Sequence, residues 1–426
     1  MGRKVVILHG WSDSSKSFQP LASRLQTALG AEVSEICLGD YLTMDDRVTF
    51  DDLDAALRKA WFLKGLPSQP GSVDMVVHST GGLVFRRWWH SFGVRAASQF
   101  PVARCVMLAP ANFGSPVAHK GASFIGRVLK GWGTSFMVGE QLLKGLELGS
   151  PYTWQMGLME QMQAYVPGRP MITVLVGNQG YGDIRAAANG YGDDGTVRIS
   201  TANLNFAFAD VDMTGDKAKL GMFEYSDLCA FGVVSGENHG SIKIPLNEKG
   251  FKYLCTGLTV TPQAFPAWRD ELKAKTAEVR RENLVYQNTV VRVRDQDGNP
   301  VPDYFLEFYR VKENWFERRM HGDAIVTTHA YSDDPSYRCF LINCDVVNGG
   351  IGPMSMGGTT GYKMSLSALP DIAKTKTVGY DTFKDGNGIE VDLTSDDLKR
   401  LFVPNRTLLV NITVKRMRSD KVFKIS

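Results

Sequence analysis

Short apolar runs separated by amphipathic stretches dominate the first 260 residues of the chain. An apolar run of a few residues bounded by turns is typical of a strand buried on both faces of a sheet. Between the runs, apolar residues recur at spacings of three or four, which indicates helices. This alternation predicts an α/β fold, with a mostly parallel central sheet covered by helices on both faces. The predicted strands span residues 5–8, 33–38, 73–77, 105–108, 172–176 and 231–234, and the first helices span 17–29, 50–63 and 81–92.

The alternation stops between residues 111 and 167, where a long insertion separates two predicted strands. Insertions of this length inside a compact domain are usually functional, and flexible methionines suit surfaces that accept varied apolar ligands. We therefore expect an apolar lid or cap over a substrate pocket. The alternative is that the same side chains pack on the core, and the sequence gives both interpretations equal weight. The candidate lid and substrate residues are Phe113, Trp132, Phe136, Met137, Trp154 and Met156.

A change of pattern near residue 260 predicts a second domain. Residues 247–258 form the expected closing helix of the first domain, and residues 266–283 have the charged amphipathic pattern of a linking helix. From residue 285 onward apolar and polar residues alternate, and the Asp-Gly pair at 297–298 lies between two such runs, which is a hairpin signal. We expect an α/β domain at 1–260, a linking helix at 261–284 and a β-sandwich-like accessory domain at 285–426.

Composition narrows the class of protein. Of the 426 residues, 43% are hydrophobic and 22% are charged, which is ordinary for a globular protein and excludes general disorder. The net charge of +3, without a Lys/Arg cluster, gives no electrostatic footprint for nucleic acid. The six cysteines form no C-x-x-C pair, so neither a metal knuckle nor a redox motif is indicated.

The apolar runs are all too short for a membrane span, and the start of the chain lacks the pattern of a signal peptide. We expect a protein that stays in the cytoplasm by default. Export by a route that needs no N-terminal signal would leave the same sequence.

The segment around Ser79 has the pattern of a strand that turns directly into a helix. The apolar run at 73–77 leads into Ser79, and the pair Gly81-Gly82 opens the next helix. A nucleophilic serine needs such a strained turn, because it exposes the hydroxyl while nearby glycines relieve crowding. Val77 stands where the common G-x-S-x-G pattern has its first glycine, so we expect the turn to open slightly. The alternative is a serine-capped helix after a strand.

Two backbone amides are candidates for an oxyanion hole. The amide of Thr80 directly follows Ser79 at the start of the helix. In enzymes with this turn, a loop after an earlier strand supplies a second amide, and His9-Gly10 at the end of the first strand places the amide of Trp11 there. Donors that are fixed in advance stabilise the negative charge of a tetrahedral intermediate.

An acid and a base must follow the serine in that order. Asp194 lies in a turn after the strand at 172–176, and we prefer it to its neighbour Asp193 and to Asp183, which lies in a similar Gly-Tyr-Gly-Asp segment. The alternatives for this acidic loop are a simple turn-rich connection and a cation site.

Among the histidines after these acids, His239 is the candidate base. It follows directly after the strand at 231–234, whereas His321 and His329 fall in the expected second domain. His78 adjoins the nucleophile, but side chains diverge at such a turn, so we expect it to point away from Ser79. In the predicted mechanism His239 takes the Ser79 proton, Asp194 fixes the imidazole tautomer and water releases an acyl-enzyme. We expect neither a metal nor a cofactor.

Taken together, these segments resemble the lipase-like α/β hydrolases, a group that includes the lecithin-cholesterol acyltransferase and PGAP-type esterase relatives. The resemblance is carried by the loop at 9–11, the turn at 77–82, the segment 194–197 with Ser200 and Leu204, and two weaker stretches at 109–116 and 148–151 that look like the borders of a lipase lid. It covers roughly residues 4–258. The departure at Val77 sets the chain apart from the standard pattern of any one branch.

The resemblance implies an α/β-hydrolase fold and hydrolysis of carboxylic esters, often of lipids, by a lipase or phospholipase. Contact with a membrane surface would go with such a substrate, and in some relatives a following β-sandwich contacts lipid or a protein partner. Acyl transfer and thioester hydrolysis use the same scaffold, and a non-catalytic binding protein could keep the fold. A further hypothesis is a toxin-like phospholipase delivered by a dedicated secretion machine.

Overall fold

The computed structural model divides into two compact units. The first comprises residues 1–205 and 226–284, and the second comprises residues 206–225 and 285–426. Each unit is described by itself below. The described residues are 4–10, 18–40, 45–120, 139–215, 217–223, 227–279, 284–312, 318–319, 324–348, 359–371, 378–384 and 387–418.

A six-stranded parallel sheet forms the centre of the first unit. Its strand order is β2-β1-β3-β4-β5-β8, and every neighbouring pair is parallel. Side chains on both faces of β3 and β8 are buried throughout, which explains why these strands read as continuous apolar runs. The six predicted strands are confirmed as β1 (Lys4–Leu8), β2 (Val33–Ile36), β3 (Val73–His78), β4 (Val102–Leu108), β5 (Met171–Gly177) and β8 (Ala230–Val234).

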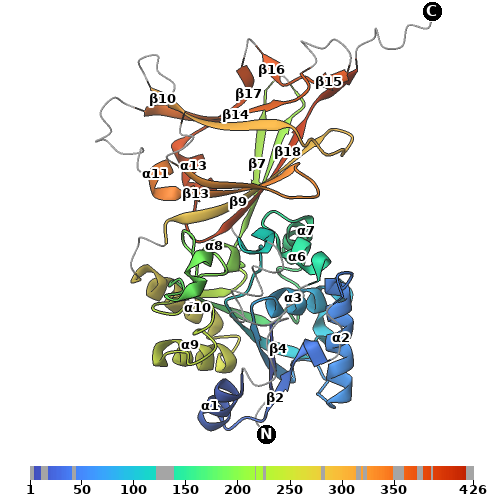
Figure 1. The fold of residues 1–426 in the computed structure, drawn as a ribbon, viewed down its shortest axis with the longest axis vertical. Helices are drawn as coiled ribbons and strands as arrows, with labels where there is room; N and C mark the ends of the chain where they lie inside the picture. The colour runs from blue at the N-terminus through green and yellow to red at the C-terminus, as the bar shows by residue number, and fades with distance from the viewer. Residues whose placement is uncertain are drawn as a thin grey trace, which may run out of the picture. The chain divides into compact units, whose positions relative to one another are not determined.

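Helices cover both faces of this sheet (Figure 1). On one face, α9 (Glu248–Thr259) packs on β4 and β5, and α10 (Phe265–Ala277) packs on β8. On the other face, α3 (Gly81–Ser91) packs on β3 and is covered by α2 (Phe50–Leu63). A Thr49–Asp52 capping box begins α2, so its start is fixed by local chemistry.

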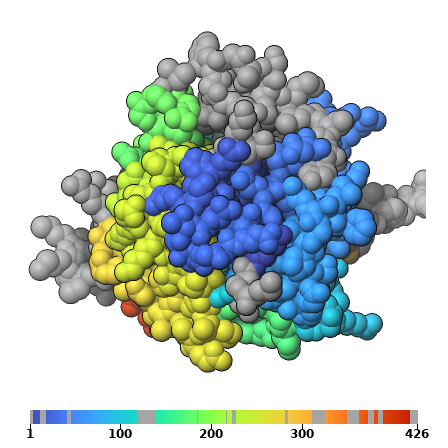
Figure 2. All heavy atoms as spheres, turned by 90° about the horizontal axis from the view of Figure 1, so that it is seen from below, coloured from blue at the N-terminus to red at the C-terminus, as the bar shows by residue number. Residues whose placement is uncertain are grey.

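The first helix, α1 (Gln19–Leu29), lies beside α9, as Figure 2 shows in dark blue and yellow. Arg24 joins the two helices, because its guanidinium donates to the carbonyls of Pro245 and Leu246 and lies 4.0 Å from the centre of the Phe251 ring. These contacts hold the segment that leads from residue 239 into α9.

The helix expected to link two domains instead packs on the first sheet. In α10, Trp268 and Leu272 are buried, and the Trp268 indole donates to the Thr173 hydroxyl on β5 at 3.1 Å. Gly232 on β8 lets α10 approach, because a Cβ atom there would lie 2.9 Å from a methyl of Leu272. The domain boundaries at 260 and 285 remain a prediction.

Two sheets enclose the core of the second unit, in keeping with the expected sandwich. One has the order β12-β13-β9-β18-β6-β7 and the other β11-β10-β14-β17-β16. The strands of the first are β6 (Ala207–Met213), β7 (Lys219–Phe223), β9 (Tyr286–Asp295), β12 (Ile325–Ala330), β13 (Tyr337–Asn343) and β18 (Thr407–Val414). Those of the second are β10 (Tyr304–Lys312), β11 (Arg318–Arg319), β14 (Thr359–Ala368), β16 (Phe383–Lys384) and β17 (Asn387–Leu393), with β15 (Val378–Tyr380) and β19 (Arg416–Arg418) forming a separate pair.

The hairpin predicted around the Asp-Gly pair is wrong in one respect. The turn is present, since the amide of Gly298 donates to the Asp295 carbonyl and Gly298 has a φ of +84°. However, β9 and β10 belong to different sheets and do not pair with each other. After the turn the two segments pair only briefly: Arg294 and Pro300 form an isolated antiparallel bridge, and the Val301 amide donates to the Val293 carbonyl at 3.1 Å.

A hairpin from the middle of the chain completes the second unit. Strand β6 pairs in parallel with β18 over residues 207–213 and 408–414, and β7 pairs with β6. Every second residue of β6 is buried in the core of this unit, beginning with Ala207. Residues 206–225 therefore pack with strands that lie about 200 positions further along the chain. Among the described residues, no helix is both long and apolar enough to cross a bilayer.

Candidate active site

Ser79 occupies the turn between β3 and α3 in a strained backbone conformation. Its φ is +54°, a left-handed value that is uncommon for a residue with a side chain. The Ser79 amide donates to the carbonyl of Leu108 on β4 at 3.1 Å, and the Ser79 carbonyl accepts from the amide of Gly82 at 3.0 Å. The side chain is partly exposed although its neighbours are buried. This is the geometry expected of an exposed nucleophile.

The glycines that follow Ser79 are required by close backbone approach. A Cβ atom on Gly82 would lie 2.7 Å from the Cβ of Pro110, closer than packed atoms come. A Cβ atom on Gly81 would lie 3.3 Å from the carbonyl oxygen of Leu8 and 3.6 Å from the Cβ of Val77. Val77 therefore fits in its fully buried position beside a residue that has no side chain. Valine is therefore tolerated at position 77, where the common motif has its first glycine.

The three residues selected from the sequence meet in one hydrogen-bonded line. His239 Nε2 lies 3.1 Å from Ser79 Oγ, and His239 Nδ1 lies 3.0 Å from Asp194 Oδ2. Asp194 and His239 are buried, exposing 0% and 1% of their surface. The backbone adds a contact, because the His239 amide donates to the Asp194 carbonyl at 2.9 Å. These contacts hold His239 between Asp194, which lies 45 positions earlier in the chain, and Ser79, which lies 160 positions earlier.

Asp194 is fixed by its own turn. Its Oδ1 accepts from the amides of Thr196 and Val197 at 3.0 and 2.8 Å, which leaves Oδ2 for His239. Ser115, in the loop after β4, donates its hydroxyl to the Thr196 carbonyl at 2.6 Å. Such contacts fix the direction of the carboxyl group.

The two alternative acids, Asp183 and Asp193, have other partners. Asp183 is exposed and paired with Arg185, whose side chain lowers the pKa of Asp183 to about 2. Asp193 is buried, and burial raises the pKa of Asp193 to about 6. One Asp193 oxygen accepts from the Gly195 amide at 3.0 Å, so it supports the turn that carries Asp194.

His78 was expected to point away from Ser79. In the structure it contacts His239. Its ring lies 4.8 Å from the ring of His239, between centroids, and its Nε2 is 3.1 Å from the His239 carbonyl oxygen. Phe18 packs on the edge of His78 and also on His9, at centroid distances of 5.8 and 4.7 Å. His78 therefore supports the base from behind, a role that sequence reasoning did not predict.

Of the two candidate oxyanion amides, only that of Thr80 belongs to a residue that the structure describes. Thr80 is the N-cap residue of α3, so its amide lies at the positive end of the helix dipole directly after Ser79. Trp11 lies outside the described residues. His9, which precedes it, is fully buried, and its Nε2 lies 3.0 Å from a carboxylate oxygen of Glu35.

The candidate lid residues also divide into two groups. Trp132, Phe136 and Met137 lie outside the described residues. Phe113, Trp154 and Met156 are buried, each exposing no more than 2% of its surface. This burial favours the alternative interpretation for these three residues, in which they pack on the core. The described part of the insertion contains α6 (Glu140–Leu146) and α7 (Pro151–Met162).

A buried ionic cluster that was not predicted fixes the insertion to the nucleophile helix. Arg86 on α3 donates to Glu160 on α7 at 3.1 Å and to the Asn112 carbonyl at 2.6 Å, and Arg86 and Glu160 are fully buried. Arg169 lies 2.9 Å from the second Glu160 oxygen. Burial favours the neutral acid, but the charges of Arg169 and its neighbours hold the pKa of Glu160 well below its ordinary value. The only sequence signal was an arginine at an apolar helix position.

In the part of the chain that the structure describes, no three His, Cys, Asp or Glu side chains group as a metal site would require. The six cysteines all lie among the described residues and form no disulfide with one another. What the site does provide is a serine hydroxyl within hydrogen-bonding distance of a histidine, and a buried aspartate within hydrogen-bonding distance of the other ring nitrogen.

Comparisons with known proteins concern the family and the fold. Residues 5–209 match the model of an alpha/beta hydrolase family. Among solved structures, phospholipase PlaB from Legionella pneumophila superposes with a TM-score of 0.85 at 23% identity, covering 100% of this chain and 96% of that one. The same protein in complex with thio-NAD gives 0.83 at 22% identity, covering 99% and 96%. No curated protein matches the chain in sequence. At these identities the likeness shows a common fold, and that fold extends over both units.

Proposed function

Because residues 5–209 match the model of an alpha/beta hydrolase family, we propose that the protein hydrolyses carboxylic esters of lipids with Ser79 as nucleophile. The observation that carries the proposal is the line from Asp194 through His239 to Ser79, with heavy-atom distances of 3.0 and 3.1 Å. Both distances are within reach of proton transfer.

In the proposed mechanism, Ser79 Oγ attacks the ester carbonyl carbon while His239 Nε2 takes the hydroxyl proton. Asp194 holds Nδ1 and stabilises the imidazolium that forms. The tetrahedral intermediate collapses when the imidazolium donates its proton to the leaving alcohol, which leaves an acyl group on Ser79. Water, deprotonated by the same histidine, then attacks the acyl carbon and releases the carboxylic acid.

The amides of Thr80 and Trp11 are proposed to bind the oxyanion of the intermediate. A helix N-terminus favours negative charge, and α3 begins directly after Thr80. Removal of one such donor in other enzymes costs about 2.7–4 kcal/mol of transition-state stabilisation.

A lipid ester is the proposed substrate. Two observations support it: the fold is shared with a phospholipase over the whole chain, and the insertion at 111–167 is rich in large apolar side chains. Trp132, Phe136 and Met137 are our candidates for the side chains that contact the acyl group. Water as acceptor gives hydrolysis, and an alcohol in its place would give acyl transfer.

The first experiment labels the purified protein with a fluorophosphonate and maps the modified residue. We expect Ser79 to be labelled in the natural protein and in Ser98→Ala, a control at an exposed serine, but not in Ser79→Ala. Hydrolysis of p-nitrophenyl acyl esters should fall by a factor of about 10⁴ or more in Ser79→Ala. Full activity in a folded Ser79→Ala protein would remove the proposed nucleophile. A panel of phospholipids and an added alcohol then separates lipase, phospholipase and transferase activities.

A further inference from the structure

Arg185, in the loop after β5, has a guanidinium group that is held in place but only partly used. Its Nε and Nη2 donate to the Asp183 carboxylate at 3.0 and 2.7 Å. Its central carbon lies 4.2 Å from the centre of the Tyr181 ring, and Tyr181 is buried. The edge formed by Nη1 and Nη2 has no acceptor of its own among the described residues, although 31% of the Arg185 side chain is exposed. This edge is therefore available to a ligand.

Arg47 shows that pairing with a nearby aspartate does not by itself hold such a group against the protein. Arg47 donates to Asp45 through the same two nitrogens, Nε and Nη2, at 3.0 and 3.1 Å. In both pairs one residue separates the aspartate from the arginine. The Arg47 side chain is nevertheless 91% exposed. Arg185 differs because it lies on the Tyr181 ring, which fixes the direction of its unused edge.

Tyr181 and Arg185 lie between the acid turn and the base. The Tyr181 hydroxyl is 3.0 Å from the hydroxyl of Thr196 in the acid turn. On the other side, a Cβ atom on Gly240 would lie 3.8 Å from Nη1 of Arg185. Gly240 directly follows His239 in the chain. The unused edge of Arg185 is therefore beside the loop that carries the base.

The loops after β4, β5 and β8 present more positive than negative charge to solvent. The described parts of these loops are residues 109–120, 178–198 and 235–247. Their cations at the surface are Lys120, Arg185 and Lys243. Asp183 is the one carboxylate of these parts at the surface, since the others are buried: Asp193, Asp194 and Glu237. Ligands of open α/β sheets bind outside the carboxyl ends of the strands, so these charges surround the expected position of a substrate.

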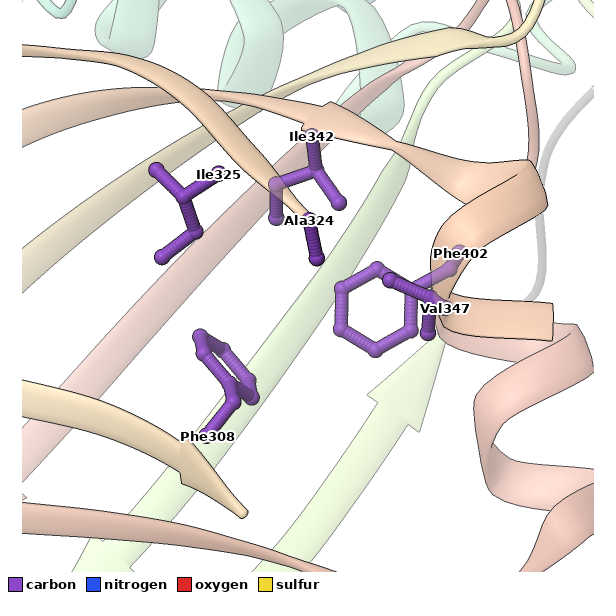
Figure 3. A pocket seen from close by; sticks show the side chains of 6 residues that line it. All are labelled: Phe308, Ala324, Ile325, Ile342, Val347 and Phe402. Carbon is purple, nitrogen blue, oxygen red and sulfur yellow. The ribbon is translucent and has the colours of Figure 1, made fainter. Parts of the chain in front are cut away.

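Two small cavities in the second unit offer no charged group to a substrate. Figure 3 shows the smaller one, which is lined by apolar side chains: Phe308, Ala324, Ile325, Ile342, Val347 and Phe402. Thr289 is the single polar residue that lines the larger one. These cavities have no group that would bind the anionic part of a lipid, whereas the loop beside His239 has one.

We propose that Arg185 determines substrate specificity by binding the phosphate of a glycerophospholipid while Ser79 attacks an ester of the same molecule. Two parallel N–H groups on one edge of a guanidinium match two oxygens of a phosphate. Lys120 and Lys243 add longer-range attraction for a negative head group. This inference rests on the proposed function, because Arg185 selects among substrates of that same site.

Hydrolysis of short-chain lipids below their critical micelle concentration tests the assignment, because a monomeric lipid removes any contribution of a charged membrane surface. The substrates are dihexanoyl phosphatidylglycerol and dihexanoylglycerol, which carries the same esters without a phosphate. We expect Arg185→Gln to raise KM for the phospholipid about tenfold or more, with kcat within about twofold. For dihexanoylglycerol kcat/KM should change about twofold or less.

Arg47→Gln is the matched control, since it removes the same pairing at a surface away from Tyr181, and it should behave as the natural protein with both lipids. An unchanged KM for the phospholipid in Arg185→Gln would overturn the proposal. An equal loss of kcat with both lipids would do so as well, because Arg185 would then position the base loop instead of binding the substrate. A natural protein that hydrolyses neither lipid would contradict the proposed function, and direct binding then decides the role of Arg185.

Calorimetric titration of Ser79→Ala measures recognition apart from catalysis. Dihexanoyl phosphatidylglycerol and dihexanoyl phosphatidylcholine are the probes, since both contain a phosphate and only the first has a net negative charge. Adding Arg185→Gln to Ser79→Ala should raise Kd for both probes about tenfold or more. An effect confined to phosphatidylglycerol would assign Arg185 to the net charge of the head group and would overturn the phosphate contact. Unchanged Kd for both would overturn the proposal as a whole.

Discussion

At the scale of single residues, His78 connects the nucleophile turn with the base. Its Nε2 faces the His239 carbonyl oxygen at 3.1 Å, and its ring packs on that of His239 in a buried layer with Phe18 and His9. A carbonyl that loses its donor inside a protein costs about 1–3 kcal/mol, and the loop can lower this cost by moving. Movement of that loop would change the distance from His239 to Ser79.

We predict that His78→Phe, which keeps an aromatic ring but removes the donor, lowers kcat for ester hydrolysis about tenfold and leaves KM within about twofold. The reason is that a misplaced base affects proton transfer more than substrate binding. Steady-state kinetics with a short-chain p-nitrophenyl ester measure both. His329→Phe, in β12 of the second unit, is the control and should behave as the natural protein. A rise in KM alone would show that His78 serves substrate binding instead.

Asp193 makes a second residue-scale prediction, which concerns stability. Burial raises its pKa from 3.8 to about 6, so in this pH range the native protein holds a proton that the unfolded chain has released. Stability from this group is therefore complete below pH 4 and is lost as pH rises through about 6, by about 3 kcal/mol in all. Asn cannot ionise, so Asp193→Asn should gain stability relative to the natural protein by about this amount between pH 4 and pH 8. Urea unfolding at both pH values measures the difference, and a constant difference would contradict the assignment.

The candidate site residues divide according to what a sequence can reveal. Ser79, Asp194 and His239 could be selected because each lies in the connection after a predicted strand, and parallel strands end at one edge of a sheet. His78 and Arg86 were not, because their partners are 161 and 74 positions away and nothing local distinguishes them from ordinary neighbours. Only the folded chain shows that the His78 ring contacts His239.

At the scale of elements, the contact between α3 and α7 determines how the insertion is held. Glu160 on α7 is fully buried between Arg86 and Arg169, and Arg86 also holds the Asn112 carbonyl beside the nucleophile turn. Removing one partner of a buried pair leaves an uncompensated charge, which is far more costly than losing a surface pair.

We predict that Glu160→Gln lowers the free energy of unfolding by about 3–5 kcal/mol. Glu140→Gln is the matched control in the same insertion, because Glu140 pairs with Lys144 at the surface, and it should change stability by no more than about 0.5 kcal/mol. Urea titration of the two variants separates them. Equal effects would mean that the buried cluster contributes no more than an exposed ion pair.

The parallel strands of the first sheet were predictable because, except for the edge strand β2, they are buried on both faces and bounded by turns. The pairing of β9 was not, since the segment after the turn pairs with it only briefly and then enters the other sheet, and no local pattern indicates that crossing. The hairpin β6–β7 was missed as well. Its alternation suits a strand, but its parallel partner β18 lies about 200 residues later, and no local pattern identifies such a partner.

At the scale of the whole molecule, the chain passes from the first unit into the second at residue 206 and returns to the first unit at residue 226. Residues 199–205 lead directly from the turn of Asp194 into β6, whose inner face belongs to the core of the second unit. We predict that a chain ending at residue 284 is inactive and aggregates, because β6 and β7 lose β18 and expose their apolar face. Esterase activity and light scattering measure this.

A second truncated chain tests whether the loss of β18 is the cause of the expected aggregation. The side-chain amide of Asn205 donates to the Cys229 carbonyl, and its oxygen accepts from the Cys229 amide, both at 3.0 Å. The two ends of the hairpin are thus close together, and a short Gly-Ser linker can replace residues 207–226. In the chain ending at 284, this replacement should restore a soluble protein. Persistent aggregation would show that the first unit needs more of the second than β18.

The position of β18 also affects synthesis on the ribosome. Since β6 pairs with residues 408–414, it emerges from the ribosome about 200 residues before its parallel partner. A nascent chain therefore carries β6 without that partner until these residues have been synthesised.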